Sequence, residues 1–278
     1  MHQNSAASPA SEARPVAAFF DLDKTIIATS SAFAFGREFM NNGLITKQEA
    51  LEMYLAKTSY MFGGMSSSEM DSTRDQLSQL VAGWSVDEVR RITDETLHSV
   101  VTPAIYTEAR ELIAFHKAAG HEIVIISASA IQLVEPIAKE LGIEHVVATE
   151  MEVKDGRFTG NITRYLKGEA KADAIVELSK RYNLDLENSY AYSDSATDIP
   201  MLAQVGNPVA VNPDRAMKKH ALEHGWEVNT FKNPEPLFHA PSAKEVSIGQ
   251  VFWPGSPPSR SAACGWLSVC AKIPLNDD

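Results

Sequence analysis

VAAFFDLDKT, residues 16–25, is an apolar run that ends in two aspartates, Asp21 and Asp23. A short continuous apolar run of this kind predicts a buried strand of a parallel sheet. The two carboxylates are close enough to repel each other, so either the strand has reached solvent or the pair shares a chemical task. The rest of the chain favours the shared task.

Strand and helix patterns alternate along the second part of the chain. Strands are predicted at 121–129, 145–153, 157–162, 188–195, 207–212 and 226–228, and helices at 104–120, 130–142, 168–182, 196–206 and 214–225. Asp155 and Gly156 separate two of these strands and predict a hairpin turn. The alternation predicts an α/β fold with a Rossmann-like, doubly wound and mostly parallel sheet.

Three segments differ in pattern from this alternating core. Residues 30–101 contain helical patterns at 30–43, 45–62, 66–84 and 85–101 without a strand signal, and predict an inserted all-helical cap. Within it, Ser85 and Glu88 have the spacing of a capping box. The core then comprises residues 15–29 and 102–239, while residues 1–14 and 240–278 predict a disordered leader and a disordered tail.

The charge balance limits the partners of the protein. The chain of 278 residues carries 25 Lys and Arg against 36 Asp and Glu, a net charge of −11 at pH 7. No basic field steers such a chain to nucleic acid or to an anionic membrane surface. The sequence also shows no membrane-spanning stretch and no signal peptide, and Cys264 and Cys270 form no disulfide framework. We therefore expect a cytoplasmic protein, whose oligomeric state the sequence does not indicate.

Polar side chains stand where the predicted strands end. They are Asp21 and Asp23 after the first strand, Ser127 after the second, Asp194 and Asp198 after a later one, and Lys171 in the helix that begins near Gly168. The carboxyl ends of parallel strands meet at one edge of the sheet, where ligands bind. Converging carboxylates suit Mg²⁺ together with a substrate phosphate. A carboxylate can also attack phosphorus, while a hydroxyl and an ammonium stabilise the phosphoryl oxygens.

These four motifs, in this order over residues 16–200, resemble those of the haloacid dehalogenase superfamily of phosphatases. FFDLDKT (19–25) is similar to the first motif, IVIISAS (123–129) to the second, KGEAK (167–171) to the third and YSDSATD (192–198) to the fourth. A helical insertion between the first two motifs resembles the C1-type cap of subfamily IB, which includes phosphoserine-phosphatase-like hydrolases. The resemblance implies a Mg²⁺-dependent phosphomonoester hydrolase that acts on a small phosphorylated metabolite through an aspartyl-phosphate.

The resemblance also implies roles for individual residues. It implies that Asp21 is the nucleophile and Asp23 the general acid and base, and that the metal is held by Asp21, Asp23 (through its carbonyl), Asp194 and Asp198. The phosphate-binding residues that it implies are Thr25, Ser127, Ala128 and a catalytic lysine. Lys167 and Lys171 both qualify, and the spacing to the fourth motif favours Lys171.

Two departures from the phosphoserine phosphatase pattern concern the substrate. Ser30 and Ser31 stand where those enzymes carry a Glu for the amino group of serine, and Glu38 lies too far along. Ala128 and Ser129 replace the Gly-Gly pair after the second motif. Phosphatase chemistry tolerates these changes, but phosphoserine as substrate does not follow from the motifs.

Two other functions share this chemistry. A phosphotransferase or mutase would use the same aspartyl-phosphate, and nothing in the sequence excludes it. A phospho-acceptor signalling domain would carry an Asp, a Ser or Thr and a Lys on a similar sheet. Asp23 argues against signalling, because a general acid and base speeds hydrolysis of a phosphoryl group that a signalling domain must retain.

Overall fold

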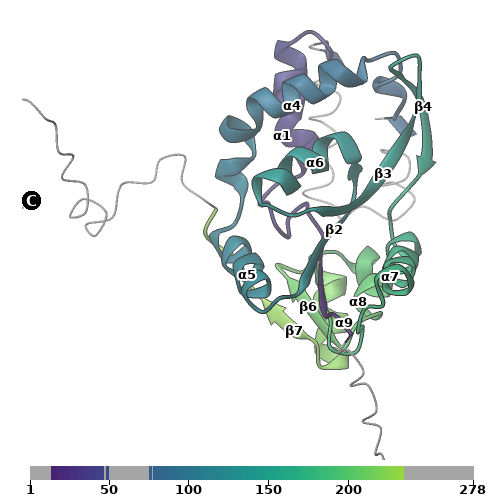
Figure 1. Cartoon of the computed structure of the whole chain (residues 1–278). Helices are drawn as coiled ribbons and strands as arrows, with labels where there is room; N and C mark the ends of the chain where they lie inside the picture. The colour runs from purple at the N-terminus through teal and green to yellow at the C-terminus, as the bar shows by residue number, and fades with distance from the viewer. Residues whose placement is uncertain (1–13, 47, 50–74, 77, 235–278) are drawn as a thin grey trace, which may run out of the picture. The chain divides into compact units, whose positions relative to one another are not determined.

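The computed structural model of the chain describes residues 14–46, 48–49, 75–76 and 78–234 (Figure 1). The predicted tail at 240–278 and nearly all of the predicted leader lie outside the described residues. No helix in the described part of the chain is both long enough and apolar enough to cross a membrane.

The described residues form a sheet with the strand order β4-β3-β2-β1-β5-β6-β7. The strands are β1 (Ala17–Phe20), β2 (Glu122–Ala130), β3 (His145–Lys154), β4 (Arg157–Arg164), β5 (Tyr190–Ser193), β6 (Asn207–Val211) and β7 (Glu227–Asn229). Every neighbouring pair is parallel except β3 and β4, which are antiparallel. This order confirms the predicted mostly parallel sheet and places β7 at its edge.

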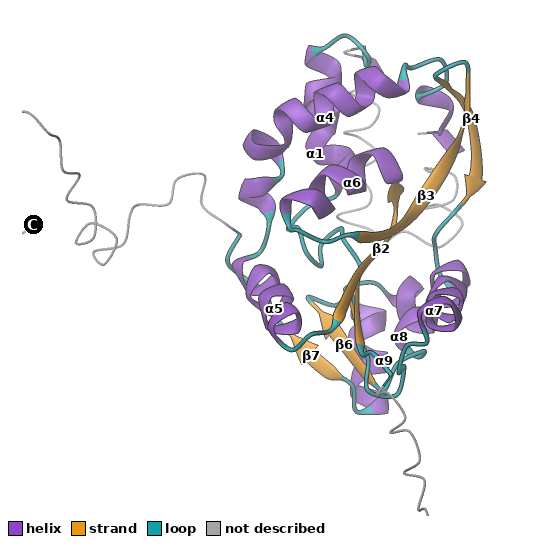
Figure 2. Cartoon of the chain, viewed as in Figure 1, coloured by secondary structure: helices purple, strands orange, loops and turns teal. Residues whose placement is uncertain are grey.

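Helices cover both faces of the sheet, which confirms the predicted doubly wound architecture (Figure 2). On one face, Ala18 and Phe20 of β1 pack with side chains of α1 (Ser31–Asn41), α4 (Val86–Val100), α5 (Thr107–Ala118) and α6 (Ile131–Glu140). On the other face, Ala17 and Phe19 pack with α7 (Glu169–Tyr182), α8 (Ile199–Leu202) and α9 (Arg215–His224). Since β1 is buried on both faces, its sequence reads as a continuous apolar run.

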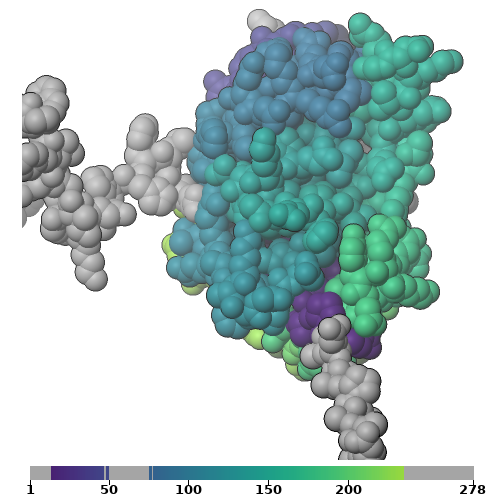
Figure 3. Space-filling model, in the orientation of Figure 1, coloured from purple at the N-terminus to yellow at the C-terminus, as the bar shows by residue number. Residues whose placement is uncertain are grey.

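The insertion between β1 and α5 is helical where it is described. Ser85 caps α4 by accepting a hydrogen bond from the Glu88 N–H at 3.4 Å, as the capping-box spacing predicts. α4 lies against α6 of the core, and Figure 3 shows the side chains of these two helices adjoining one another. Most of the helix predicted at 45–62, and much of the one predicted at 66–84, fall outside the described residues.

The hairpin of β3 and β4 joins the core to this insertion. Its turn residues Asp155 and Gly156 have φ angles of 50° and 73°, as a tight Asp-Gly turn requires. The Gly83 N–H donates to the Phe158 carbonyl at 2.7 Å, and the Phe158 N–H donates to the Trp84 carbonyl at 3.1 Å. The predicted turn is confirmed, and the hairpin forms main-chain contacts with the insertion that the sequence pattern does not contain.

Two predicted helices are shorter in the structure. The helix predicted at 104–120 begins at Thr107, because Ile105 is extended and forms an antiparallel bridge with Ile27. The helix predicted at 196–206 is a 3-10 turn, η2 (Ala196–Asp198), followed by α8. Beyond α8 the chain turns to Gly206, where a Cβ would stand 1.8 Å from the Glu187 carbonyl oxygen, so only glycine fits.

Candidate active site

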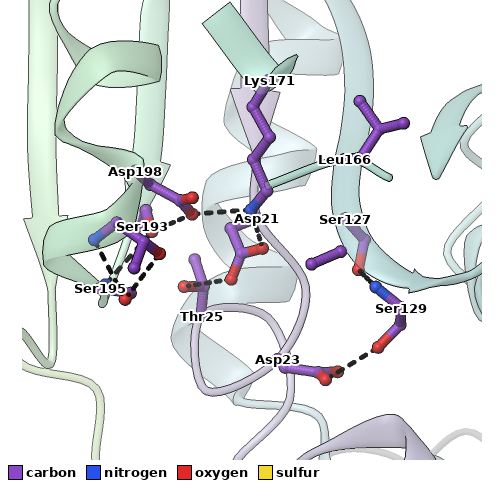
Figure 4. A network of polar contacts seen from close by, with 12 residues as sticks. Asp21, Asp23, Thr25, Ser127, Ser129, Leu166, Lys171, Ser193, Ser195 and Asp198 are labelled. Carbon is purple, nitrogen blue, oxygen red and sulfur yellow. Dashed lines mark hydrogen bonds and ion pairs between the residues drawn. The ribbon is translucent and has the colours of Figure 1, made fainter. Parts of the chain in front are cut away.

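The loop after β1 turns the two aspartates toward different surroundings. The Asp21 N–H still donates to the Tyr192 carbonyl of β5 at 2.9 Å. Beyond Asp21 the chain leaves strand geometry, and the N–H groups of Ile26 and Ile27 both donate to the Leu22 carbonyl, at 2.9 and 3.1 Å. The carboxylate of Asp21 points toward Lys171, whereas that of Asp23 points toward Ser129 (Figure 4).

The first group of contacts, here named the charged side, consists of Asp21, Lys171 and Asp198. The Lys171 Nζ lies 2.6 Å from Asp21 Oδ1 and 2.7 Å from Asp198 Oδ2. All three residues are buried, Lys171 and Asp198 each with an exposed fraction of only 2%. Hydroxyls complete the group: Thr25 donates to Asp21 Oδ2 at 3.3 Å and Ser193 to Asp198 Oδ2 at 2.7 Å. Lys171, rather than Lys167, therefore lies between the carboxylates of the first and fourth motifs.

The charges on this side have displaced pKa values. Burial raises the pKa of Asp21 to about 7 and outweighs the Lys171 ammonium, which lowers it. Burial lowers the pKa of Lys171, but the carboxylates of Asp198 and Asp21 raise it by more, so it stays above its ordinary value. Burial, followed by the charge of Asp21, raises the pKa of Asp194 well above its ordinary value. Three carboxylates, those of Asp21, Asp194 and Asp198, thus face two ammonium groups, those of Lys24 and Lys171.

The second group of contacts, here named the hydroxyl side, consists of Asp23, Ser129 and Ser31. Asp23 Oδ1 accepts a hydrogen bond from the Ser31 N–H at 2.9 Å, and Oδ2 accepts one from the Ser129 hydroxyl at 3.0 Å. The Ser31 hydroxyl donates to Ser129 Oγ at 2.8 Å. The Ser129 N–H donates to Ser127 Oγ at 3.1 Å, so this group reaches the predicted phosphate-binding serine.

Thr149 joins the second motif to the third, although no sequence pattern singles it out. Its hydroxyl donates to the Ala128 carbonyl at 2.7 Å, and its Oγ1 accepts from the Leu166 N–H at 3.2 Å. Ala128 follows Ser127, and Leu166 stands shortly before the helix that carries Lys171. The four motifs imply no role for Ser31, Ser129 or Thr149, so only their contacts identify them.

Asp194, at the end of β5, has the features of an incomplete cation site. Only 8% of the residue is exposed, and its carboxylate lies in the field of the negative charges of Asp21 and Asp198 and of the positive charge of Lys24. Its carbonyl accepts the Asp214 N–H at 2.8 Å, which holds the loop in place. Within the described part of the chain, no group of three His, Cys, Asp or Glu side chains is already arranged around a metal ion. The uncompensated carboxylates nevertheless are hard oxygen donors that suit Mg²⁺.

Comparison with known proteins identifies the family. The family model described as haloacid dehalogenase-like hydrolase matches residues 18–203, which contain all four motifs. The chain belongs to this family of hydrolases, as the resemblance of its motifs predicts.

Individual relatives agree with this assignment. A protein of Mycobacterium tuberculosis (strain ATCC 25618 / H37Rv) named probable phosphatase is 46% identical over 234 residues, covering 83% of this chain and 82% of its own. A phosphoserine phosphatase of the same strain is 35% identical over 218 residues, covering 78% and 71%. A solved phospho-aspartyl intermediate analogue of phosphoserine phosphatase has a TM-score of 0.58 at 22% identity, covering 80% of this chain and 95% of its own. At that identity, the solved structure supports the fold alone.

Proposed function

We propose that the chain is a Mg²⁺-dependent phosphomonoester hydrolase that acts on a small phosphorylated metabolite through an aspartyl-phosphate on Asp21. The observation that carries the proposal is the buried contact of 2.6 Å between Asp21 Oδ1 and the Lys171 ammonium, with Asp23 turned away from both. A phosphoryl group brings negative oxygens to this ammonium, and a nucleophile needs a separate proton donor. The family membership and the names of the relatives support the same reaction.

In the first step, a carboxylate oxygen of Asp21 attacks phosphorus and the bond from phosphorus to the ester oxygen breaks. Asp23 gives its proton to the departing oxygen, so the product leaves as an alcohol. Lys171 and the hydroxyl of Ser127 stabilise the charge on the phosphoryl oxygens. Thr25 holds the second oxygen of Asp21 and thereby orients the nucleophile.

In the second step, Asp23 accepts a proton from a water molecule that attacks the phosphorus of the aspartyl-phosphate. The bond from phosphorus to Asp21 breaks, inorganic phosphate forms and the Asp21 carboxylate is restored. Asp21, the carbonyl of Asp23, and Asp194 would hold Mg²⁺, with Asp198 orienting its waters. The ion would supply the positive charge that the carboxylates lack. Asp198 also fixes the Lys171 ammonium from the side opposite Asp21.

The substrate is the part of the proposal in which this chain departs from its phosphoserine phosphatase relatives. Ser30 and Ser31 provide no negative charge for the amino group of phosphoserine at the position where a Glu is expected. Ser31 is fully buried, and its N–H and hydroxyl are both used within the hydroxyl side. We therefore expect phosphoserine to be a poor substrate beside phosphomonoesters without an amino group.

The test compares wild type with Asp21→Asn, which keeps the shape of the side chain but removes the nucleophile. Wild type should release p-nitrophenol from p-nitrophenyl phosphate only with Mg²⁺, and Asp21→Asn should lose at least about 10⁴-fold in kcat. Acid quenching of a turnover reaction should trap phosphate on wild type alone. Hydrolysis that is independent of Mg²⁺, or an active Asp21→Asn variant, would contradict the proposal. A panel of phosphorylated metabolites, phosphoserine included, then ranks the substrates.

A second experiment measures the ion directly. Mg²⁺ at a hundred times its dissociation constant should stabilise wild type by about 2.7 kcal/mol, seen as a higher unfolding temperature. Asp194→Asn should lose most of this shift, whereas Asp173→Asn, on the exposed face of α7, should keep it. An equal shift in all three proteins would place the ion elsewhere.

A further inference from the structure

We propose that Ser129 and Ser31 are positioning residues that hold the carboxylate of Asp23 toward the leaving group of the substrate. The inference rests on the proposed function, because it concerns the proton that Asp23 moves. It assigns roles to two residues to which the motifs give none: Ser129, at the end of the second motif in β2, and Ser31, the first residue of α1.

The contacts form a chain of hydroxyls that ends on Asp23. The Ser31 hydroxyl donates to Ser129 Oγ at 2.8 Å, and the Ser129 hydroxyl donates to Asp23 Oδ2 at 3.0 Å. The Ser31 N–H holds the other oxygen, Oδ1, at 2.9 Å. With both oxygens held from different segments, the carboxylate is fixed in rotation as well as in position.

Helix α1 adds a second reason for this orientation. Ser31 is its first residue, and the side chain of the N-cap residue Ser30 caps no N–H of the helix. The Asp23 carboxylate accepts the first N–H instead, and a negative charge is favoured at a helix N-terminus. The first N–H of α1 thus binds the carboxylate of Asp23, so the placement of α1 and the orientation of Asp23 depend on each other.

Ser129 also connects the proton donor to the phosphate site. Its N–H donates to Ser127 Oγ at 3.1 Å, while its hydroxyl donates to Asp23 (Figure 4). One residue therefore sets the distance between the group that binds the phosphoryl oxygens and the group that protonates the ester oxygen. Loss of its hydroxyl should disturb proton transfer more than phosphate binding.

Leaving groups of different basicity separate these two effects. p-Nitrophenolate is a stable anion that departs with little help from an acid, whereas an alkoxide needs a proton as its bond to phosphorus breaks. The experiment measures kcat/KM, which reports formation of the aspartyl-phosphate, for p-nitrophenyl phosphate and for the best alkyl phosphate in the substrate panel. The proteins are wild type, Ser129→Ala, Ser31→Ala, Ser129→Thr, Asp23→Asn, Asp23→Asn with Ser129→Ala, and the control Ser179→Ala on α7.

Ser129→Ala should lower kcat/KM for the alkyl phosphate about 10- to 100-fold and for p-nitrophenyl phosphate less than about threefold. Ser31→Ala should also lower kcat/KM more for the alkyl phosphate than for p-nitrophenyl phosphate. The loss should be smaller, because the N–H of residue 31 still holds Asp23 Oδ1. Ser129→Thr retains the hydroxyl and should restore most of the activity. In the Asp23→Asn protein, the added Ser129→Ala should leave kcat/KM unchanged for both substrates, because the carboxyl group that Ser129 positions is already absent. Thermal unfolding of each variant shows whether it is folded.

Equal losses on both substrates, or a further loss in the Asp23→Asn protein, would overturn the inference while leaving the proposed function intact. A wild type that hydrolyses neither phosphate with Mg²⁺ would overturn the proposed function and this inference with it. Ser179→Ala should match wild type on both substrates, since its hydroxyl donates to the Val176 carbonyl within its own helix, α7.

Discussion

The two sides of the candidate site are built from different kinds of contact. The charged side places Lys171 between Asp21 and Asp198, with almost no exposure to solvent. The hydroxyl side holds Asp23 through Ser129 and Ser31, which carry no charge. The charged side comes from the loop after β1, from α7 and from η2, whereas the hydroxyl side includes Ser31, the first residue of α1.

In the proposed reaction, the charged side acts on the phosphoryl group that all phosphate esters share, and the hydroxyl side acts on the leaving group, which differs among them. Breaking a buried ion pair costs about 3–5 kcal/mol, whereas a hydrogen bond from an uncharged donor to a carboxylate contributes about 1.5–3 kcal/mol. Asp21, the proposed nucleophile, and the Lys171 ammonium are therefore held strongly. Asp23, the proposed proton donor, is held by weaker bonds, one of which comes from the first N–H of α1. A change in α1 should therefore affect Asp23 more than Asp21.

The largest effect is expected on the charged side, from Lys171→Met. Without the ammonium, Asp21 and Asp198 become two buried carboxylates without their cation, and the free energy of unfolding should fall by about 3–5 kcal/mol. Denaturation by urea without added Mg²⁺ measures this loss. Lys167→Met serves as the matched control and should be far milder, because Lys171 is the lysine between the two carboxylates. A Lys171→Met protein as stable as wild type would show that the ion pairs of the charged side do not stabilise the site more than the hydrogen bonds of the hydroxyl side do.

His116 is a second buried titratable group, whose pKa responds to burial and to another histidine rather than to a carboxylate. It is fully buried on α5, with Nε2 2.8 Å from the Tyr192 hydroxyl and Nδ1 2.8 Å from His121 Nδ1. Burial, followed by the charge of His121, lowers its pKa from 6.5 to about 4. The buried ammonium of Lys171 stays charged because carboxylates face it, whereas His116 stays neutral.

The lowered pKa gives His116 a defined contribution to stability as the pH changes. Between pH 6.5 and about 4 the unfolded chain binds a proton that the folded chain does not, so stability decreases as the pH falls. This stability is fully present above pH 6.5, and about 3 kcal/mol of it is lost once the pH has fallen to about 4. Urea unfolding at several pH values should show a shallower decline for His116→Gln than for wild type. The exposed control His98→Gln should follow wild type, and equal slopes for all three would contradict the assignment.

The fold was largely predictable because strand and helix patterns are local. The apolar run before Asp21 and the Asp-Gly turn at 155–156 depend on neighbouring residues alone, and both are confirmed. The ends of the helices predicted at 104–120 and 196–206 were not predictable. They are set by contacts with distant residues, such as the bridge between Ile105 and Ile27.

The candidate site was predictable only where strand ends determine it. Asp21 and Asp194 follow parallel strands, whose carboxyl ends must meet at one edge of the sheet. Ser31 and Ser129 lie 98 positions apart, and a lone serine has no pattern that predicts its partner. In the sequence, these serines differ from the residues of a substrate-binding pattern, and nothing more is indicated about them. Their contacts with Asp23 are seen only in the structure.

Thr149→Val should have the smallest effect and tests whether the two sides can be separated. It removes the hydrogen bonds to the Ala128 carbonyl and from the Leu166 N–H, and should cost about 1–3 kcal/mol of stability. Because these bonds set the second motif against the segment that leads to Lys171, kcat/KM should fall about 10-fold for aryl and alkyl phosphates alike. Thr149→Ser keeps the hydroxyl and should retain most of the activity. A fall confined to alkyl phosphates would mean that Thr149 acts on Asp23, and that the charged and hydroxyl sides are a single unit.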